Sequence, residues 1–291
     1  MKYIEKHPII MIIVGVFGIS LSSIFVKYST APSAVTATFR LLWTVVLMTG
    51  VVLGKKTVRY EFSQTSKKTF LLSFISGIFL AIHFVLWFES LSHTSVASST
   101  TIVCTEVIWV SLGYYLFMNG KISPKAICAI LVTVLGSIFI ALSDASGTTG
   151  LYGDILALLA AIAVAVYMLL GRIVRLKAST SVYTYIVYVS CSITLIAMCL
   201  IQKMNIFSYG ISAIIVGLLL AIFSTILGHS IFSWCLKYYS PSFVSASKLC
   251  EPVVAAIFAA FLFNEIPTPL QLIGSVLILG GVFYYSRIEN K

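Results

Sequence analysis

Long apolar runs follow one another along almost the whole of this 291-residue chain. A helix needs roughly 20 mainly apolar residues to cross the hydrocarbon core of a bilayer, since each residue adds about 1.5 Å. Hydrophobic residues make up 59% of the sequence and charged residues 10%, whereas roughly a quarter of a soluble domain is charged. The sequence therefore predicts an all-α integral membrane protein whose surroundings are the lipid bilayer.

Ten of the runs are long enough to span a membrane. Turn-forming residues such as Asn119-Gly120 and Ser240-Pro241 separate them. The first run exceeds the apolar core of about 7–15 residues in a signal peptide, so it is interpreted as a retained span. The predicted spans are residues 8–26, 33–53, 69–91, 95–118, 125–143, 151–171, 181–201, 211–236, 242–263 and 268–286.

Ten spans place both termini on the same side of the membrane. Of the 19 basic residues, 15 then lie on the side of the termini, two lie on the other side, and Arg40 and Lys248 lie within spans. Basic residues concentrate on the cytoplasmic side of membrane proteins, so the termini are predicted to be cytoplasmic, N-in and C-in. The basic residues form no stripe interleaved with polar contacts, and a nucleic-acid partner is therefore not expected.

Two acids, Glu106 and Glu251, occupy corresponding places in two apolar runs, 145 positions apart. This offset predicts two copies of one module, residues 1–146 and 147–291, with five helices each. Five spans per copy make the two repeats inverted, an architecture in which secondary transporters bind substrate near the midplane. Two copies in one chain remove the need for a dimer, so a monomer is expected. The same offset also joins Leu91 to Leu236, Ser95 to Ser240, Asn119 to Asn264, Pro124 to Pro269 and Gly136 to Gly281.

Several short motifs carry a resemblance to a known family. The second half contains Tyr239-Ser-Pro-Ser, Cys250-Glu-Pro-Val-Val, Phe263-Asn-Glu-Ile and Gly280-Gly-Val; the first contains Ser22-Ser-Ile-Phe-Val-Lys27 and Thr105-Glu-Val. Over nearly its whole length the chain resembles EamA-type carriers of the drug/metabolite transporter superfamily. The resemblance implies ten helices in two inverted repeats, a cavity lined mainly by helices 1, 3, 4, 6, 8 and 9, and transport of small metabolites, with amino acid export recurring. The expected location is the cytoplasmic membrane of a prokaryote.

Charged residues inside the spans are the sharpest site signal, because an ionised group at the bilayer centre costs on the order of 3 kcal/mol or more. Lys248 and Glu251 are three residues apart and share a helix face. Lys248 is a candidate for binding an acidic group of the substrate, or else for pairing with Glu251. Pro252 is expected to weaken the helix at this point because it lacks a backbone donor.

Glu106 and Glu251 are candidates for proton coupling or for a structural acid. The sequence leaves three states open for Glu106: protonated, hydrogen-bonded, or paired with Lys248. Arg40 stays charged and needs a partner, for which Glu89 lies at a suitable predicted depth.

Aromatic and histidine side chains on the third and eighth predicted spans complete the candidate set. They are candidates for substrate contact, with packing as the alternative for each, and the histidines are also candidates for proton relay. The candidate substrate-binding residues beside Lys248 are Trp87, Trp234, Phe84, His83 and His229.

The sequence predicts a secondary transporter that exports small amphipathic metabolites such as amino acids by alternating access. An exchanger of organic anions or phosphorylated metabolites, with Lys248 and Arg40 as an anion clamp, is the alternative. An integral membrane enzyme is more remote, because no catalytic cluster is recognisable. No metal site and no cofactor are expected, and the absence of GxxxxGK[ST] indicates coupling to a gradient, with protons as a candidate, rather than to ATP.

Overall fold

The described part of the chain is helical throughout. The computed structural model describes residues 8–94, 99, 102–144, 150–251, 253–254, 257–258, 261 and 268–289, and these residues form helices, turns and short connections without a β-strand. A helix pairs its backbone N–H and C=O groups within its own segment, which is the condition for crossing lipid. The predicted all-α class is confirmed for these residues.

Seven of the ten predicted spans appear, in the described residues, as helical segments long and apolar enough to cross a membrane. The predicted spans 95–118 and 125–143 overlap the shorter apolar stretches Ile102–Met118 and Pro124–Phe139, and the span 242–263 is described only in part. Ten spans in inverted repeats therefore remain a prediction. The seven segments are Pro8–Val26, Ser33–Gly54, Lys67–His93, Leu151–Arg175, Thr180–Ile201, Ile206–Cys235 and Pro269–Ile288.

Large apolar side chains lie on the outside of these helices. Phe117, Ile201 and Val276 are 83%, 80% and 71% exposed. Exposed apolar surface on this scale is characteristic of a protein whose solvent is lipid. Together with the long apolar helices, it supports an integral membrane protein.

The helices form two compact units, Met1–Val85 with Val166–Tyr238 and Leu86–Ala165 with Tyr239–Lys291. Each unit takes helices from both halves of the sequence, and the long helices α6 (Lys67–His93) and α10 (Leu151–Arg175) contribute to both units. The predicted boundary between the repeats, at residues 146 and 147, lies outside the described residues, so the division of the sequence into 1–146 and 147–291 stays a prediction.

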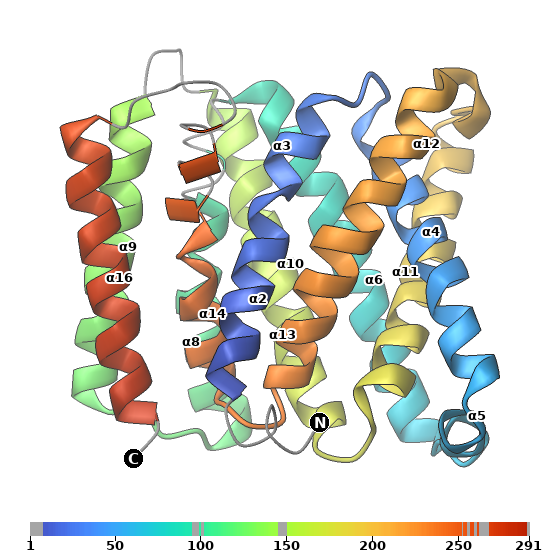
Figure 1. Cartoon of the computed structure of the whole chain (residues 1–291), viewed down its shortest axis with the longest axis horizontal. Helices are drawn as coiled ribbons and strands as arrows, with labels where there is room; N and C mark the ends of the chain where they lie inside the picture. The colour runs from blue at the N-terminus through green and yellow to red at the C-terminus, as the bar shows by residue number, and fades with distance from the viewer. Residues whose placement is uncertain are drawn as a thin grey trace. The chain divides into compact units, whose positions relative to one another are not determined.

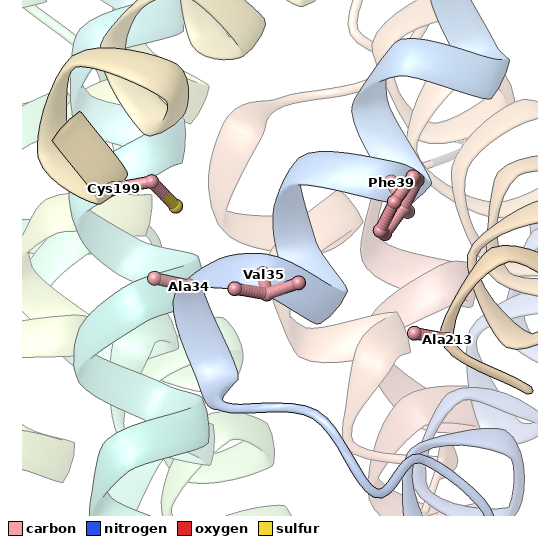
Figure 2. Packing of buried hydrophobic residues seen from close by; sticks show 5 residues of the cluster. All are labelled: Ala34, Val35, Phe39, Cys199 and Ala213. Atoms are coloured by element: carbon pink, nitrogen blue, oxygen red, sulfur yellow. The ribbon is translucent and has the colours of Figure 1, made fainter. Parts of the chain in front are cut away.

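In the first unit, α4 packs against α11 and α12. Figure 2 shows the buried residues of this contact: Ala34, Val35 and Phe39 come from α4, Cys199 from α11 and Ala213 from α12. The helices of this unit are α2 (Pro8–Ser20), α3 (Ser22–Lys27), α4 (Ser33–Gly54), α5 (Lys56–Ser63), α11 (Thr180–Ile201), η1 (Ile206–Tyr209), α12 (Gly210–Leu219), η2 (Leu220–His229) and α13 (Ser230–Cys235), with parts of α6 and α10.

In the second unit, α9 (Pro124–Asp144) and α16 (Pro269–Glu289) lie side by side (Figure 1). A Cβ on Gly136 of α9 would lie 2.6 Å from the carbonyl oxygen of Gly274, and one on Gly281 of α16 would lie 3.1 Å from that of Ala129. The two glycines allow the backbones to approach closely, as small residues do in membrane helices. The other helices of the unit are α8 (Glu106–Met118) and α14 (Pro241–Lys248), which pack against each other, with parts of α6 and α10.

Glycine packing in the first unit gives a direct test of the fold. A Cβ on Gly77 of α6 would collide with the carbonyl of Val187 and lie 2.7 Å from Cβ of Ser190. We expect Gly77→Ala to lower the free energy of unfolding by about 1–3 kcal/mol through overpacking. The measurement is the melting temperature of the detergent-purified protein.

Gly50→Ala is the matched control, because a Cβ on Gly50 of α4 meets no described atom within 4 Å. This replacement should stabilise the helix by about 0.5–1 kcal/mol. A Gly77→Ala protein that melts at or above the wild-type temperature would contradict the close α6–α11 contact.

Candidate functional site

The helix that carries Glu106 begins at this residue, after a local break. The N–H of Thr105 donates to the carbonyl of Ile102 at 3.0 Å, which is a bond over three residues instead of the four of an α-helix. Glu106 is thereby placed in the first turn of α8. The partial positive charge at a helix N-terminus favours a carboxylate there.

The second half of the chain has a break at the equivalent position. α14 ends at Lys248, and the N–H of Cys250 then donates to the carbonyl of Ser247 at 3.2 Å before helical structure resumes at Glu251. The donor Cys250 lies 145 positions after Thr105, so the same three-residue bond precedes each acid. Pro252, which was expected to weaken this helix, lies outside the described residues.

An ion pair joins the two broken helices within the second unit. Nζ of Lys248 lies 2.7 Å from Oε1 of Glu106, and the hydroxyl of Ser245 donates to the same oxygen at 3.0 Å. The side chains of Lys248 and Glu106 are only 13% and 5% exposed. Of the three states left open for Glu106, the structure shows two together: the carboxylate is hydrogen-bonded by Ser245 and paired with Lys248.

Glu251 is half-buried one turn after Lys248. The predicted pairing of Lys248 with Glu251 stays a prediction, as does the role of either acid in proton coupling. Lys248 and Glu251 lie on neighbouring turns and Glu106 contacts Lys248 from α8, so either a proton or an anionic ligand could redistribute the pairing.

Arg40 is a buried cation of the first unit. It is 1% exposed; its Nε donates to Oγ1 of Thr225 at 2.7 Å, and its Cζ lies 4.2 Å from the ring centroid of Phe84. A cation over an aromatic face is stabilised by the ring quadrupole. Glu89, the predicted partner of Arg40, lies in the second unit and contacts His93 at 3.2 Å, and the Arg40–Glu89 pairing stays a prediction.

Three of the candidate substrate-binding residues gather in the first unit. The ring of Phe84 lies 5.3 Å from that of His83 and 5.4 Å from that of His229, measured between centroids. His229 also lies 6.1 Å from Tyr167, whose hydroxyl is 2.9 Å from Oγ of Ser233. The sequence analysis missed Tyr167, Ser233 and Thr225 because they are ordinary span residues until the helices are packed.

The two candidate tryptophans, Trp87 and Trp234, lie in different units. Trp87 of α6 is buried beside Phe88, with 5.3 Å between ring centroids. The ring of Trp234 of α13 lies 4.4 Å from that of Tyr238, tilted by 43°. Substrate contact by either tryptophan remains a prediction.

Ser245 is a further residue that the sequence analysis missed. It lies three residues before Lys248 and therefore on the same face of α14, so the spacing could have identified it. Its hydroxyl gives Glu106 a second donor, which a buried carboxylate requires when it is held away from water.

A profile of the EamA-like transporter family matches residues 7–142 and 151–287. The chain is 24% identical to the pseudopaline exporter CntI of Pseudomonas aeruginosa over 98% of both sequences, and 23% identical to an uncharacterized transporter of Archaeoglobus fulgidus over 75% of both. A solved crystal structure covering 98% of both chains shares the fold, with a TM-score of 0.80 and 14% identity.

The ion pair predicts a strong coupling between two replacements. Lys248→Met leaves a buried carboxylate without its cation, and Glu106→Gln leaves a buried ammonium without its anion. Each should lower the free energy of unfolding by about 3–5 kcal/mol, whereas the double variant should lose much less than the sum. Denaturant unfolding of the detergent-purified variants measures this coupling.

Lys237→Met is the control for removal of a positive charge, because Lys237 is exposed. It should change the stability by no more than about 0.5 kcal/mol. Additive losses in the double variant would show that Glu106 and Lys248 do not stabilise each other.

Proposed function

The chain belongs to the EamA-like transporter family, and on this premise we propose that it is a secondary transporter that exports small amphipathic metabolites with a carboxylate, such as amino acids. The observation that carries the proposal is the buried pair of Lys248 and Glu106, at 2.7 Å. A buried ionisable pair inside a membrane protein is expensive and marks substrate or ion pathways.

Lys248 is the proposed ligand for the substrate carboxylate. In the structure its ammonium is held by a carboxylate of the protein, which has the same chemistry as the acidic group of an amino acid. A substrate carboxylate can therefore replace Glu106 at Lys248 without leaving the ammonium unpaired. The exchange keeps the cost of desolvation low because one ion pair substitutes for another.

Glu106 is the proposed proton carrier. When its carboxylate takes up a proton, its attraction for Lys248 falls and the ammonium becomes available to the substrate. Loss of the proton restores the pair and expels the bound carboxylate. Glu251, one turn beyond Lys248, is the second candidate for this role.

The ion pair also bears on alternating access. Glu106 belongs to the first predicted repeat, residues 1–146, and Lys248 to the second, residues 147–291. In the proposed mechanism the two repeats are inverted five-helix modules that move against each other, as in other carriers of this architecture. Breaking and re-forming the Lys248–Glu106 contact would then accompany each half of the cycle.

Aromatic side chains are proposed to contact the apolar part of the substrate. Phe84, His83 and His229 form one cluster of rings. Trp87 and Trp234 are proposed as further contacts. The name of the Pseudomonas aeruginosa relative, an exporter of pseudopaline, supports export of a small metabolite as the direction of transport.

The proposal also includes the location, oligomeric state and partners that the sequence predicts. We place the chain in a prokaryotic cytoplasmic membrane as a monomer, with both termini inside. Its partners are the bilayer, the substrate and protons, and no nucleic acid is involved.

Exchange of organic anions or phosphorylated metabolites is the alternative. It uses Lys248 and Arg40 as anion ligands. The present contacts favour the amino-acid proposal, because Arg40 is bonded to Thr225 and stacked on Phe84. Binding of an amino acid needs only one such cation, because its carboxylate can replace that of Glu106 at Lys248.

Ligand-dependent melting of the purified protein tests the proposal. A panel of amino acids, dicarboxylates and sugar phosphates is added at pH 5.5 and pH 8. A ligand at 100 times its Kd stabilises the native state by about 2.7 kcal/mol, which corresponds to a rise of several degrees in melting temperature. We expect amino acids to give the rise.

The double variant Glu106→Gln/Lys248→Met removes the pair without leaving a buried charge, and it should abolish the rise. Lys237→Ala, which removes an exposed lysine, should retain it. A rise that persists in the double variant would refute Lys248 as the carboxylate ligand, and a rise with phosphates alone would favour the anion exchanger.

A further inference from the structure

A long π-helical segment interrupts the helix formed by α12 and α13. Residues Leu220–His229 form this segment, η2, which is 10 residues long. At its end the N–H of Ser230 donates to the carbonyl of Thr225, five residues back. π-Helical segments are rare and mostly a single turn, and they occur frequently at functional sites. Because such a long segment is unusual, side-chain contacts must favour its hydrogen-bond register over that of an α-helix.

The side chains that do so converge on Thr225. Its hydroxyl accepts from Nε of Arg40 at 2.7 Å and donates to the carbonyl of Leu220 at 3.2 Å, across five residues. Its carbonyl accepts from Oγ of Ser230 at 3.2 Å and from the hydroxyl of Tyr188 at 3.5 Å. Tyr188 and Ser230 are also 2.9 Å apart through their hydroxyls. Thr225 is thus held from both sides of the interruption.

Arg40 supplies the strongest of these contacts, since hydrogen bonds from a charged donor exceed neutral ones. The guanidinium cannot lose its charge, and its position is fixed by the ring of Phe84, 4.2 Å from Cζ. Phe84 also lies 5.4 Å from His229, the last residue of η2. Arg40 and His229 therefore share one aromatic neighbour.

We propose that Arg40 is a positioning residue whose bond to Thr225 holds η2 in its π-helical register and so fixes the direction of His229. A slip of one residue toward the α-helical register would turn the following side chains by about 100°. His229 would then leave Phe84 and Tyr167. The substrate contact of His229 rests on the proposed function, whereas the register does not.

Disulfide linking measures the register directly. A Cβ on Gly15 of α2 would lie 3.3 Å from Cγ2 of Ile231, directly after η2. Cysteines at these two positions, Gly15→Cys and Ile231→Cys, fall within the reach of a disulfide only while Ile231 faces α2. The linked peptides are quantified by mass spectrometry after mild oxidation of the full-length protein.

The matched control is a contact of the same unit that does not involve η2. Oγ1 of Thr38 lies 3.5 Å from Sγ of Cys199, so Thr38→Cys should link α4 to the native Cys199 of α11. This second pair reports whether the helices of the unit remain packed.

Each of the two cysteine pairs is combined with one of three replacements. Thr225→Val removes the hydroxyl, Thr225→Ser keeps it, and Arg40→Gln removes the charged donor. We expect Thr225→Val and Arg40→Gln to lower the linking of positions 15 and 231 by about tenfold, as the loss of one charge-assisted hydrogen bond implies. Thr225→Ser should link as the wild type does. Linking of position 38 to Cys199 should be unchanged in all three.

Three results would overturn the proposal. Undiminished linking at 15 and 231 in Arg40→Gln would show that another contact sets the register. A parallel loss at position 38 would make Arg40 a general packing residue, and an equal loss in Thr225→Ser would exclude the hydroxyl as the reason. The linking experiment uses no substrate, so its result does not depend on whether the proposed function is correct.

Discussion

Lipid offers no hydrogen-bond partners, and this constraint governs both the helices and the buried charges of the protein. Backbone groups are paired inside long helices, and polar side chains have to find partners in the packed interior. Two cations within the predicted spans, Lys248 and Arg40, meet the constraint in different ways. Lys248 is held by the carboxylate of Glu106, while Arg40 is held by the hydroxyl of Thr225 and the ring of Phe84.

This difference separates a contact that can change from one that persists. Uptake of a proton by Glu106, or arrival of another carboxylate, alters the environment of Lys248 at once. Thr225 and Phe84 carry no titratable charge, and the guanidinium of Arg40 itself stays charged at any physiological pH. The chemistry therefore suits Lys248 and Glu106 to coupling, and Arg40 to holding a fixed geometry.

The sequence predicted what depends on neighbours along the chain. The lengths of the apolar runs correctly predicted seven long helices in the described residues. The shared offset of Glu106 and Glu251 identified two acids that follow equivalent helix breaks. The pairing of Glu106 with Lys248 was one of three open states, because spacing gives the face of a helix but not its partner. The π-helical segment gave no signal, since its bond to Arg40 joins residues 185 positions apart.

The helix interruptions are of two opposite kinds. Bonds over three residues tighten the chain before Glu106 and Glu251, whereas bonds over five residues widen it between Leu220 and His229. Both replace the regular α-helical bond near a charged side chain: Arg40 donates to Thr225 within the wider segment, and Glu106 begins α8 directly after one of the tighter bonds. Changes of register or pairing cost least where the regular ladder is already broken, and carriers need such bistable elements to alternate between states. Each unit therefore has its own place where side-chain contacts accompany a broken backbone ladder: Arg40 with Thr225 in the first unit, and Lys248 with Glu106 in the second.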